Sequence, residues 1–297
     1  MPSFDYAQDK PFDYAQGRSF DPDFDDARWT LEWAKTPILQ VPTGQHPDGY
    51  VVIERQLTQA HIFDRIYTAS QAFPVRALLD PLGRLWMSDT PQERMMMFNN
   101  ARVSRGHIPI GGLGLALYPQ YAAARARRFT VVEHSRAVRD IVGPTLERAL
   151  SDPTGLQDPS GLKPIPFEII ACDVAEFLSK EPATRYDTIF LDTWDTLDAK
   201  LLPSLNRLRD LAIGHLAPGG RVLLWGYRWM VRLFEDACRQ LLNVPPNRRD
   251  AWLAKRDRPE AAALLQPVVA HFVGRVVEDI EEALQWCRGH ITTARET

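Results

Sequence analysis

Four apolar runs in the middle of the chain end in residues that suit ligand binding. We expect buried strands at HIPI, FTVVE, FEIIACD and YDTIFLD, because each run is nearly continuously apolar rather than alternating. The residues at or just after the ends of these runs are, in chain order, Gly111, Gly112, Gly114, Glu133, Asp173, Asp192, Trp194 and Asp195. If the strands are parallel, these residues gather at one edge of a sheet, where α/β proteins bind their ligands.

The first three groups suit a nucleotide. Glycines at 111, 112 and 114 would let the backbone turn tightly and approach a ligand. Glu133 follows them by about twenty residues, the spacing at which a carboxylate can accept both hydroxyls of a ribose. Asp173 could bond the edge of an adenine or cap the helix VAEFLSK. An ordinary turn and a surface Glu133 are the alternatives, but the joint spacing favours the nucleotide site.

The fourth group, Asp192–Asp195, suits chemistry on a second molecule. Asp192 could orient an acceptor or take a proton from it, and Asp195 could hold a cationic end. Trp194 could stack on a planar or cationic ligand, or simply cover the edge of the sheet. We therefore take Asp192, Trp194 and Asp195 as candidate catalytic residues.

The elements that would position these residues predict an α/β fold. Between residues 101 and 243, strands alternate with helical stretches, which predicts a doubly wound, mostly parallel sheet. Residues 29–100 predict a small β-rich lobe, and residues 244–297 a helical extension. Residues 1–28 contain FDYAQDK and FDYAQGR in tandem; they are acidic and lack aliphatic side chains, so we expect them to be disordered.

The β-rich lobe has two turn signals and one helix signal. Hairpins are predicted from Ile38–Val41 to Tyr50–Ile53 and around the turn Asp80–Gly83. A helix should begin at Pro91, capped by Asp89 or Thr90. The methionines at 95–97 could line a ligand pocket, but core packing is the favoured interpretation.

Composition excludes several classes of protein. The net charge of −3 gives no basic footprint for nucleic acid, and no apolar run approaches the ~20 residues of a membrane span. The three cysteines lie far apart and the histidines lack suitable neighbouring acids, so no metal site is expected. We expect a cytoplasmic protein with reduced thiols. An apolar face at Val276, Ile280, Leu284 and Cys287 would pack on its own domain or form a homodimer.

The chain resembles the class I S-adenosylmethionine-dependent methyltransferases over about residues 76–226, and within them the spermidine synthase branch. The glycine loop of that branch is matched by IGGLG, its ribose acid by Glu133 and its adenine-side acid by Asp173. Its D-x-x-D catalytic loop is matched by YDTIFLDTWD. The hairpin and the D-E pair before the loop are matched by VRALLDPLGRLWMSDTPQERM, and LAPGGRVLLWG matches the strand before the last helices.

The resemblance implies that S-adenosylmethionine or its decarboxylated form binds, and it leaves three functions open. Methyl transfer to a small-molecule acceptor is favoured. Aminopropyl transfer is second, because Leu85–Trp86 and Met95–Met97 stand where aminopropyltransferases carry a Gln and a Tyr-His-Glu triplet. A non-catalytic binding module is third; apolar Ile110, where many methyltransferases have an acid, and a helical stretch after Gly226 in place of a closing β-hairpin support it.

Overall fold

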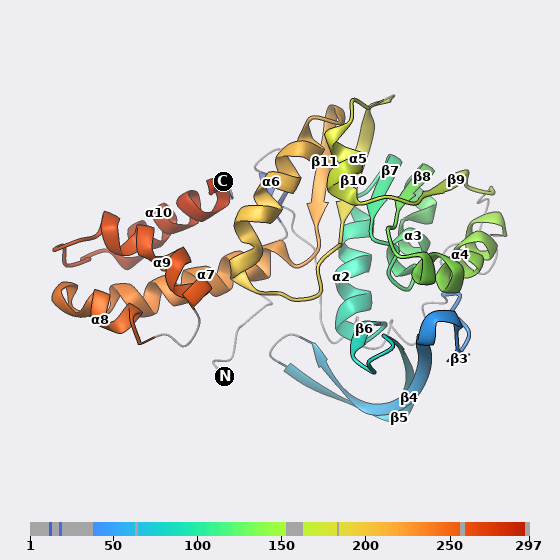
Figure 1. The fold of residues 1–297 in the computed structure, drawn as a ribbon, viewed down its shortest axis with the longest axis horizontal. Coiled ribbons are helices and arrows are strands. Elements are labelled where there is room, and N and C mark those ends of the chain that lie inside the picture. Colours follow the sequence, from blue (N-terminus) through green and yellow to red (C-terminus); the bar gives the residue numbers. More distant parts are fainter. Residues whose placement is uncertain are drawn as a thin grey trace. The chain divides into compact units, whose positions relative to one another are not determined.

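The computed structural model describes residues 12–13, 18–19, 38–62, 65–152, 163–182, 184–255 and 259–294 (Figure 1). By their internal contacts, the residues up to Asp195 and those from Leu211 to Trp225 form unit 1. Unit 2 comprises Thr196–Asp210 and the residues from Gly226 onward. Within the described part of the chain, no helix is both long and apolar enough to span a bilayer.

A five-stranded parallel sheet forms the core of unit 1. Its order is β11-β10-β7-β8-β9, and each neighbouring pair is parallel. Its strands are β7 (Gly106–Gly111), β8 (Ala126–Val132), β9 (Phe167–Ile170), β10 (Tyr186–Leu191) and β11 (Leu216–Leu224). Because β7 comes first in the chain but lies in the middle, the strand order reverses between β7 and β10, which is the usual ligand position of such sheets. The predicted parallel α/β fold is confirmed.

Helices follow the strands as the sequence predicts. They are α3 (Leu117–Ala122) with η3 (Ala123–Arg125), α4 (Arg136–Ser151), α5 (Val174–Ser179) and, after η5 (Ala199–Leu201), α6 (Leu202–Ile213). The Ser135 hydroxyl accepts from the Val138 amide at 3.3 Å and so begins α4. Ile108, Phe129 and Ile189 are fully buried on the sheet, which explains why the strands are apolar throughout.

The β-rich lobe of unit 1 is an antiparallel sheet in the order β3-β4-β5-β6. Its strands are β3 (Gly44–Gln45), β4 (Val51–Ile62), β5 (Arg65–Leu79) and β6 (Leu85–Ser88), with η2 (Pro47–Gly49) between the first two. The second predicted hairpin is confirmed, since Gly83 donates to the Asp80 carbonyl at 2.8 Å and adopts a φ of 75°.

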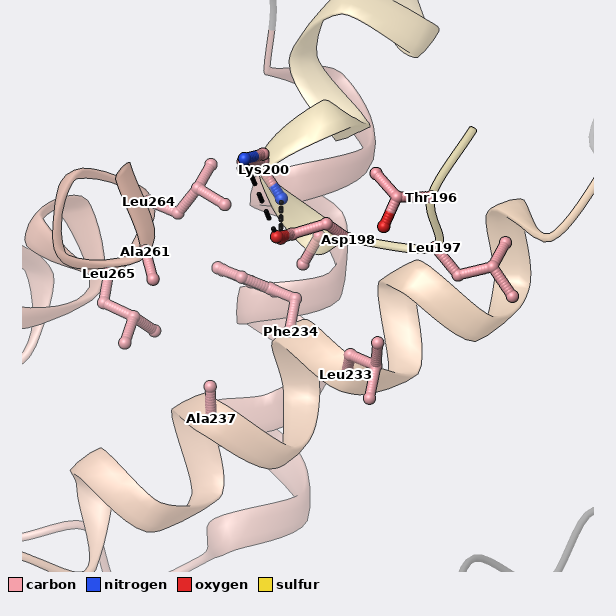
Figure 2. Close-up of a pocket in the computed structure, with 11 residues that line it drawn as sticks. Thr196, Leu197, Asp198, Lys200, Leu233, Phe234, Ala237, Ala261, Leu264 and Leu265 are labelled. Carbon is pink, nitrogen blue, oxygen red and sulfur yellow. Dashed lines mark hydrogen bonds and ion pairs between the residues drawn. The ribbon is translucent and has the colours of Figure 1, made fainter. Parts of the chain in front are cut away.

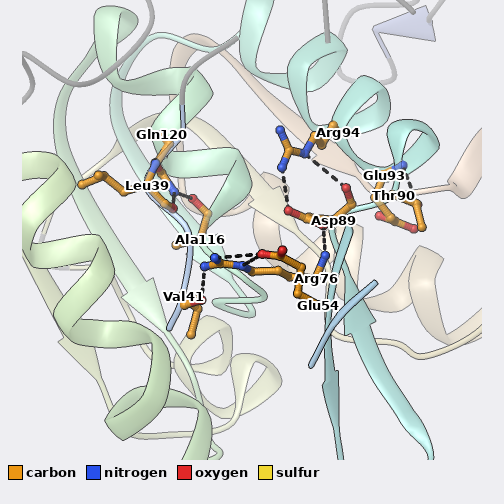
Figure 3. A network of polar contacts seen from close by, with 10 residues as sticks. All are labelled: Leu39, Val41, Glu54, Arg76, Asp89, Thr90, Glu93, Arg94, Ala116 and Gln120. Carbon is orange, nitrogen blue, oxygen red and sulfur yellow. Dashed lines mark hydrogen bonds and ion pairs between the residues drawn. The ribbon is translucent and has the colours of Figure 1, made fainter. Parts of the chain in front are cut away.

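The first predicted hairpin is partly wrong. Val51 and Val52 pair with Gln45 and Gly44, and Ile38–Val41 forms no strand. The reason is that the Gln120 side chain accepts from the Leu39 amide at 2.7 Å and donates to its carbonyl at 3.0 Å (Figure 3). With both main-chain groups of Leu39 occupied by a side chain of unit 1, the apolar segment does not need a partner strand.

Helix α2 (Pro91–Arg102) begins where the sequence predicts. Thr90 is the cap, because its hydroxyl accepts from the Glu93 amide at 3.4 Å. Asp89 instead forms a buried ion pair with Arg94 at 2.6 Å and accepts from the Arg76 amide (Figure 3). The methionines at 95–97 are buried, and Met95 packs in a cluster with Ala60, Phe73 and Val75, which supports core packing.

Unit 2 is helical in its described residues. It holds α7 (Tyr227–Leu242), η6 (Pro246–Arg248), α8 (Arg249–Leu253), α9 (Pro259–His271) and α10 (Ile280–Thr293). The predicted helical C-terminal region is confirmed. The predicted apolar face is wrong at Val276, which precedes α10 and is 76% exposed, whereas Leu284 and Cys287 are buried.

Some sequence predictions fall outside this description. In the tail, only Phe12–Asp13 (β1) and Arg18–Ser19 (β2) are described, as an antiparallel pair. The other residues of the predicted disordered segment 1–28 lie outside the described residues, so that prediction stays untested. The predicted domain boundaries also stay predictions. The internal contacts divide the chain into only two units, and they place residues 196–210 in the same unit as the residues from 226 onward.

Candidate functional site

The predicted site residues of β7, β8 and β10 lie together at the carboxyl edge of the sheet. Hydrogen bonds continue past the strand ends: Gly112 donates to the Val132 carbonyl at 2.9 Å, and Asp192 donates to the Gly111 carbonyl at 2.8 Å. Glu133, one residue further, donates to the Ile170 carbonyl at 3.0 Å. The sheet therefore fixes the glycine loop, Glu133 and Asp192 side by side, as the sequence predicts.

The three glycines have different reasons to be glycine. A Cβ on Gly112, whose φ is 88°, would lie 2.1 Å from the Asp192 carbonyl oxygen. A Cβ on Gly111 would lie 2.9 Å from the side chains of Leu191 and Val174. Gly114 has a φ of 55° and nothing within 4 Å of its missing Cβ. Packing within the protein explains the first two, whereas Gly114 borders open space into which a ligand could fit.

Glu133 is buried and holds the glycine loop. It is 6% exposed, its Oε2 accepts from the Leu113 amide at 2.9 Å, and its Oε1 accepts from the Ser135 amide at 2.7 Å. The alternative of a surface glutamate is therefore wrong. Each carboxylate oxygen has a second lone pair, so the side chain can still accept from a ribose hydroxyl.

Asp173 lies one strand further along the sheet and caps α5. Its Oδ1 accepts from the amides of Ala175 at 2.7 Å and Glu176 at 3.2 Å. The capping role weighed for this residue is confirmed. Because the residue is exposed, its second carboxylate oxygen faces solvent at the ligand edge of the sheet.

Asp192 lies in an unfavourable electrostatic environment. Burial raises the pKa of Asp192 well above its ordinary range, and the nearby carboxylates of Glu93 and Glu133 raise it further. Burial also raises the pKa of Glu93 to about 7, although the neighbouring indole of Trp225 opposes the rise. A carboxyl group that titrates near 7, as Glu93 does, can exchange protons near neutral pH, and carboxyl groups of raised pKa are common in catalytic sites.

Glu93 is the site residue that the sequence analysis missed. It lies in the first turn of α2, where an acid is already explained by the helix dipole. Only the fold brings this helix turn from the β-rich lobe beside the end of β10. The available signal was its place within the D-E pair segment that the resemblance had matched.

Two tryptophans border the same edge. Trp194 follows β10 and Trp225 follows β11, and their ring centroids lie 6.5 Å apart at an angle of 45°. The Nε1 atom of Trp194 is buried and has no hydrogen-bond partner among the described residues, whereas the Trp225 indole lies beside the Glu93 carboxyl group. Buried donors of this kind usually have a partner, so a ligand with an acceptor atom would complete this one. Asp195 is exposed. Among the described residues, no cluster of His, Cys, Asp and Glu is arranged to hold a metal.

No model of a known protein family matches this chain, and no curated protein matches it. Among solved structures, it is similar to the precorrin 8w decarboxylase of Methanobacterium thermoautotrophicum, with 18% identity and a TM-score of 0.32 over 45% of this chain and 61% of that one. It is also similar to N-methyltransferase NodS of Bradyrhizobium japonicum, with 16% identity and a TM-score of 0.31 over 46% of this chain and 72% of NodS.

A third similar structure is the precorrin-6y C5,15-methyltransferase of Geobacter metallireducens, with 13% identity and a TM-score of 0.34 over 50% of this chain and 70% of that one. The chain spans about six tenths of the length of the decarboxylase. At these identities and TM-scores, the similarity carries no activity, substrate or ligand over to this chain.

Proposed function

We propose that this protein binds S-adenosylmethionine and transfers its methyl group to a small-molecule acceptor. The observation that carries the proposal is the meeting of a glycine loop, a ribose-type acid and a second acid of raised pKa at the strand-order reversal of a parallel sheet. The cellular compartment and the oligomeric state stay predictions.

The donor would bind along the edge from β7 to β9. Open space beside Gly114 would take the part of the donor that lies against the loop. Glu133 would accept from the ribose hydroxyls through its remaining lone pairs, and Asp173 would lie toward the adenine. The buried Nε1 atom of Trp194 is a donor that an acceptor atom of the ligand could pair. The residues present therefore fit a nucleoside with polar substituents.

The acceptor would meet Asp192. The bound donor supplies an electrophilic methyl group on a sulfonium; the acceptor's lone pair forms the new bond and the carbon–sulfur electrons return to sulfur. Asp192 would take the proton that the acceptor loses, because burial and the neighbouring acids raise its pKa and so make its carboxylate a stronger base. The protein's main contribution would be to hold the two reactants in line.

Aminopropyl transfer is a second candidate, favoured by the charge of the site. Glu93, Glu133 and Asp192 place three acids close together, and their mutual repulsion would be relieved by a cationic amine. The same charge favours an amine as the acceptor in methyl transfer. The donor that binds therefore distinguishes the two reactions.

The test measures donor binding first and turnover second. Calorimetry with S-adenosylmethionine, its decarboxylated form and its demethylated product should show the tightest binding for S-adenosylmethionine. Amines, hydroxyls and thiols are then screened as acceptors with both donors, and the best pair is repeated with Asp192→Asn. We expect a rate loss on the order of 10² and a change in donor affinity of less than ~1 kcal/mol.

The matched control is Asp140→Asn, which removes an exposed acid from α4 and should change neither quantity. Unchanged turnover in Asp192→Asn would remove Asp192 from the mechanism. Good donor binding without turnover of any acceptor would favour the non-catalytic binding module. If no donor form binds, the proposal as a whole is wrong.

A further inference from the structure

We propose that unit 2 contains a separate small-molecule site that takes an amphipathic ligand with an apolar body and one anionic head. The site is a cavity of about 310 Å³ whose lining residues all belong to unit 2 (Figure 2). That volume lies at the lower end of the range of ~300–1,000 Å³ seen for ligand pockets. Nothing in the proposed transferase function uses this cavity.

The body of the cavity is apolar. Helices α7 and α9 and the segment before α6 contribute its aliphatic and aromatic walls (Figure 2). These walls include Leu197, Leu233, Phe234, Ala261, Leu264 and Leu265. Phe234 and Leu265 are almost completely buried, at 1% and 2% exposure, so packing within the unit fixes this part of the lining. A fixed apolar hollow favours an apolar ligand that covers it from water.

One rim of the cavity carries charge. Asp198 begins η5: its Oδ1 accepts from the Lys200 amide at 3.0 Å. Its Oδ2 lies 3.9 Å from the Lys200 Nζ, which is the outer limit of an ion pair. Figure 2 shows both contacts beside the apolar walls.

The two charges of the rim are not equally available. The Asp198 carboxylate is tied to the main chain that it caps, whereas the Lys200 side chain is 44% exposed and its ammonium group contacts the acid only at that limit. An ammonium has three donors, so it can turn toward an incoming carboxylate without breaking the cap. Charge complementarity therefore points to an anionic head on the ligand.

The experiment uses octanoate, octanol and octylammonium as probes that share one apolar body. Binding to the full-length protein is measured by calorimetry, with each probe kept below its aggregation concentration. We expect saturable binding at one site, with octanoate tighter than octanol and octylammonium weakest. The donor and its product are absent, so a failure of the transferase proposal does not affect the result.

Two variants with matched controls test the geometry. Ala261→Phe fills the cavity from a half-buried position on α9 and should weaken octanoate by about tenfold or more, as loss of most of its apolar contact would. Ala263→Phe adds the same side chain at an exposed position of α9 outside the lining and should have no effect.

Lys200→Gln tests the head. The substitution should weaken octanoate binding by about three- to fivefold, which is typical of the loss of a partly exposed ion pair, and it should leave octanol binding unchanged. Lys255→Gln, at an exposed lysine of the same unit, should change neither. The proposal is overturned if no probe saturates, if octylammonium binds best, or if Ala261→Phe and Ala263→Phe behave alike.

Discussion

Two buried polar side chains of unit 2 differ from those at the sheet edge of unit 1. In unit 2, Arg249 is 2% exposed, and it donates to the carbonyls of Phe272 at 2.8 Å, Val244 at 3.1 Å and Leu242 at 3.2 Å. Asn206, fully buried, donates to the carbonyls of Ile291 at 2.8 Å and Ala294 at 2.9 Å. These two side chains complete helix ends, so they serve stability.

At the sheet edge of unit 1, buried groups have been left without such partners. Asp192 faces the like charges of Glu93 and Glu133, and the Trp194 indole has an unpaired donor. Such a cost is tolerated where a ligand supplies the missing partners. The contrast with Arg249 and Asn206 therefore supports the proposal of a ligand site at this edge.

The largest effect should come from removing a buried polar side chain whose hydrogen bonds are complete. Arg249→Ala removes three hydrogen bonds to main-chain carbonyls and leaves a cavity, so we expect a loss of about 3–5 kcal/mol in the free energy of unfolding. Denaturant unfolding measures it. Arg248→Ala, at the exposed neighbouring position, should lose less than ~0.5 kcal/mol. Similar losses in both variants would mean that the buried guanidinium adds nothing.

A smaller effect, on donor binding, is expected at Glu133, the proposed ribose acid. Glu133→Gln keeps the size of the side chain but replaces an acceptor oxygen by a donor, so binding of S-adenosylmethionine should weaken by about 1–3 kcal/mol. Calorimetric titration compares it with Glu147→Gln, an exposed substitution on α4. Because Glu133 also holds the Leu113 amide, the melting temperature is recorded alongside. Equal donor affinities in the two variants would contradict the assignment of Glu133.

The last effect concerns the pH dependence of stability. Burial raises the folded-state pKa of Glu93 from 4.5 to about 7, so the folded protein binds this proton more tightly than the unfolded chain. Stability from this group is present at low pH and is lost as the pH rises toward and through 7. Glu93→Gln should therefore be more stable than wild type by about 3 kcal/mol near pH 8, and equally stable near pH 4.

Thermal unfolding at both pH values checks this sign. Glu147→Gln provides the reference, because it removes an exposed glutamate. If Glu93→Gln were less stable than wild type near pH 8, the carboxylate would have a favourable partner, and the contrast between the two units would weaken.

Local signals were enough to predict the sheet and its edge. Apolar runs located β7 to β10, and Asp173, weighed from the sequence as a cap, marked the start of the helix that follows β9. In a parallel sheet, the carboxyl ends of the strands share one edge. The pattern alone therefore predicted that the glycine loop, Glu133 and Asp192 lie close together.

Tertiary contacts decided the rest. The hairpin β4–β5 escaped prediction because residues 54–56, 58 and 59 of β4 are exposed on both faces, which leaves no alternation to detect. Ile38–Val41 has a strand-like composition, but a glutamine 81 residues away from Leu39 in the chain takes its hydrogen bonds. The position of Glu93 beside Asp192 depends on tertiary contacts. It could not be predicted from local sequence, because an acid in the first turn of a helix is common.

In the proposed function, the close approach of Gly112 to Asp192 would couple the binding of donor and acceptor. The Asp192 carbonyl lies where a methyl group on residue 112 would collide with it, so the loop after β7 and the loop after β10 are in direct contact. A molecule that orders one loop would also favour the ordered conformation of the other loop. By thermodynamic linkage, each of the two ligands would then change the affinity for the other by the same factor. Donor and acceptor should consequently bind cooperatively, and the free energy of that coupling should be the quantity most sensitive to any enlargement of residue 112.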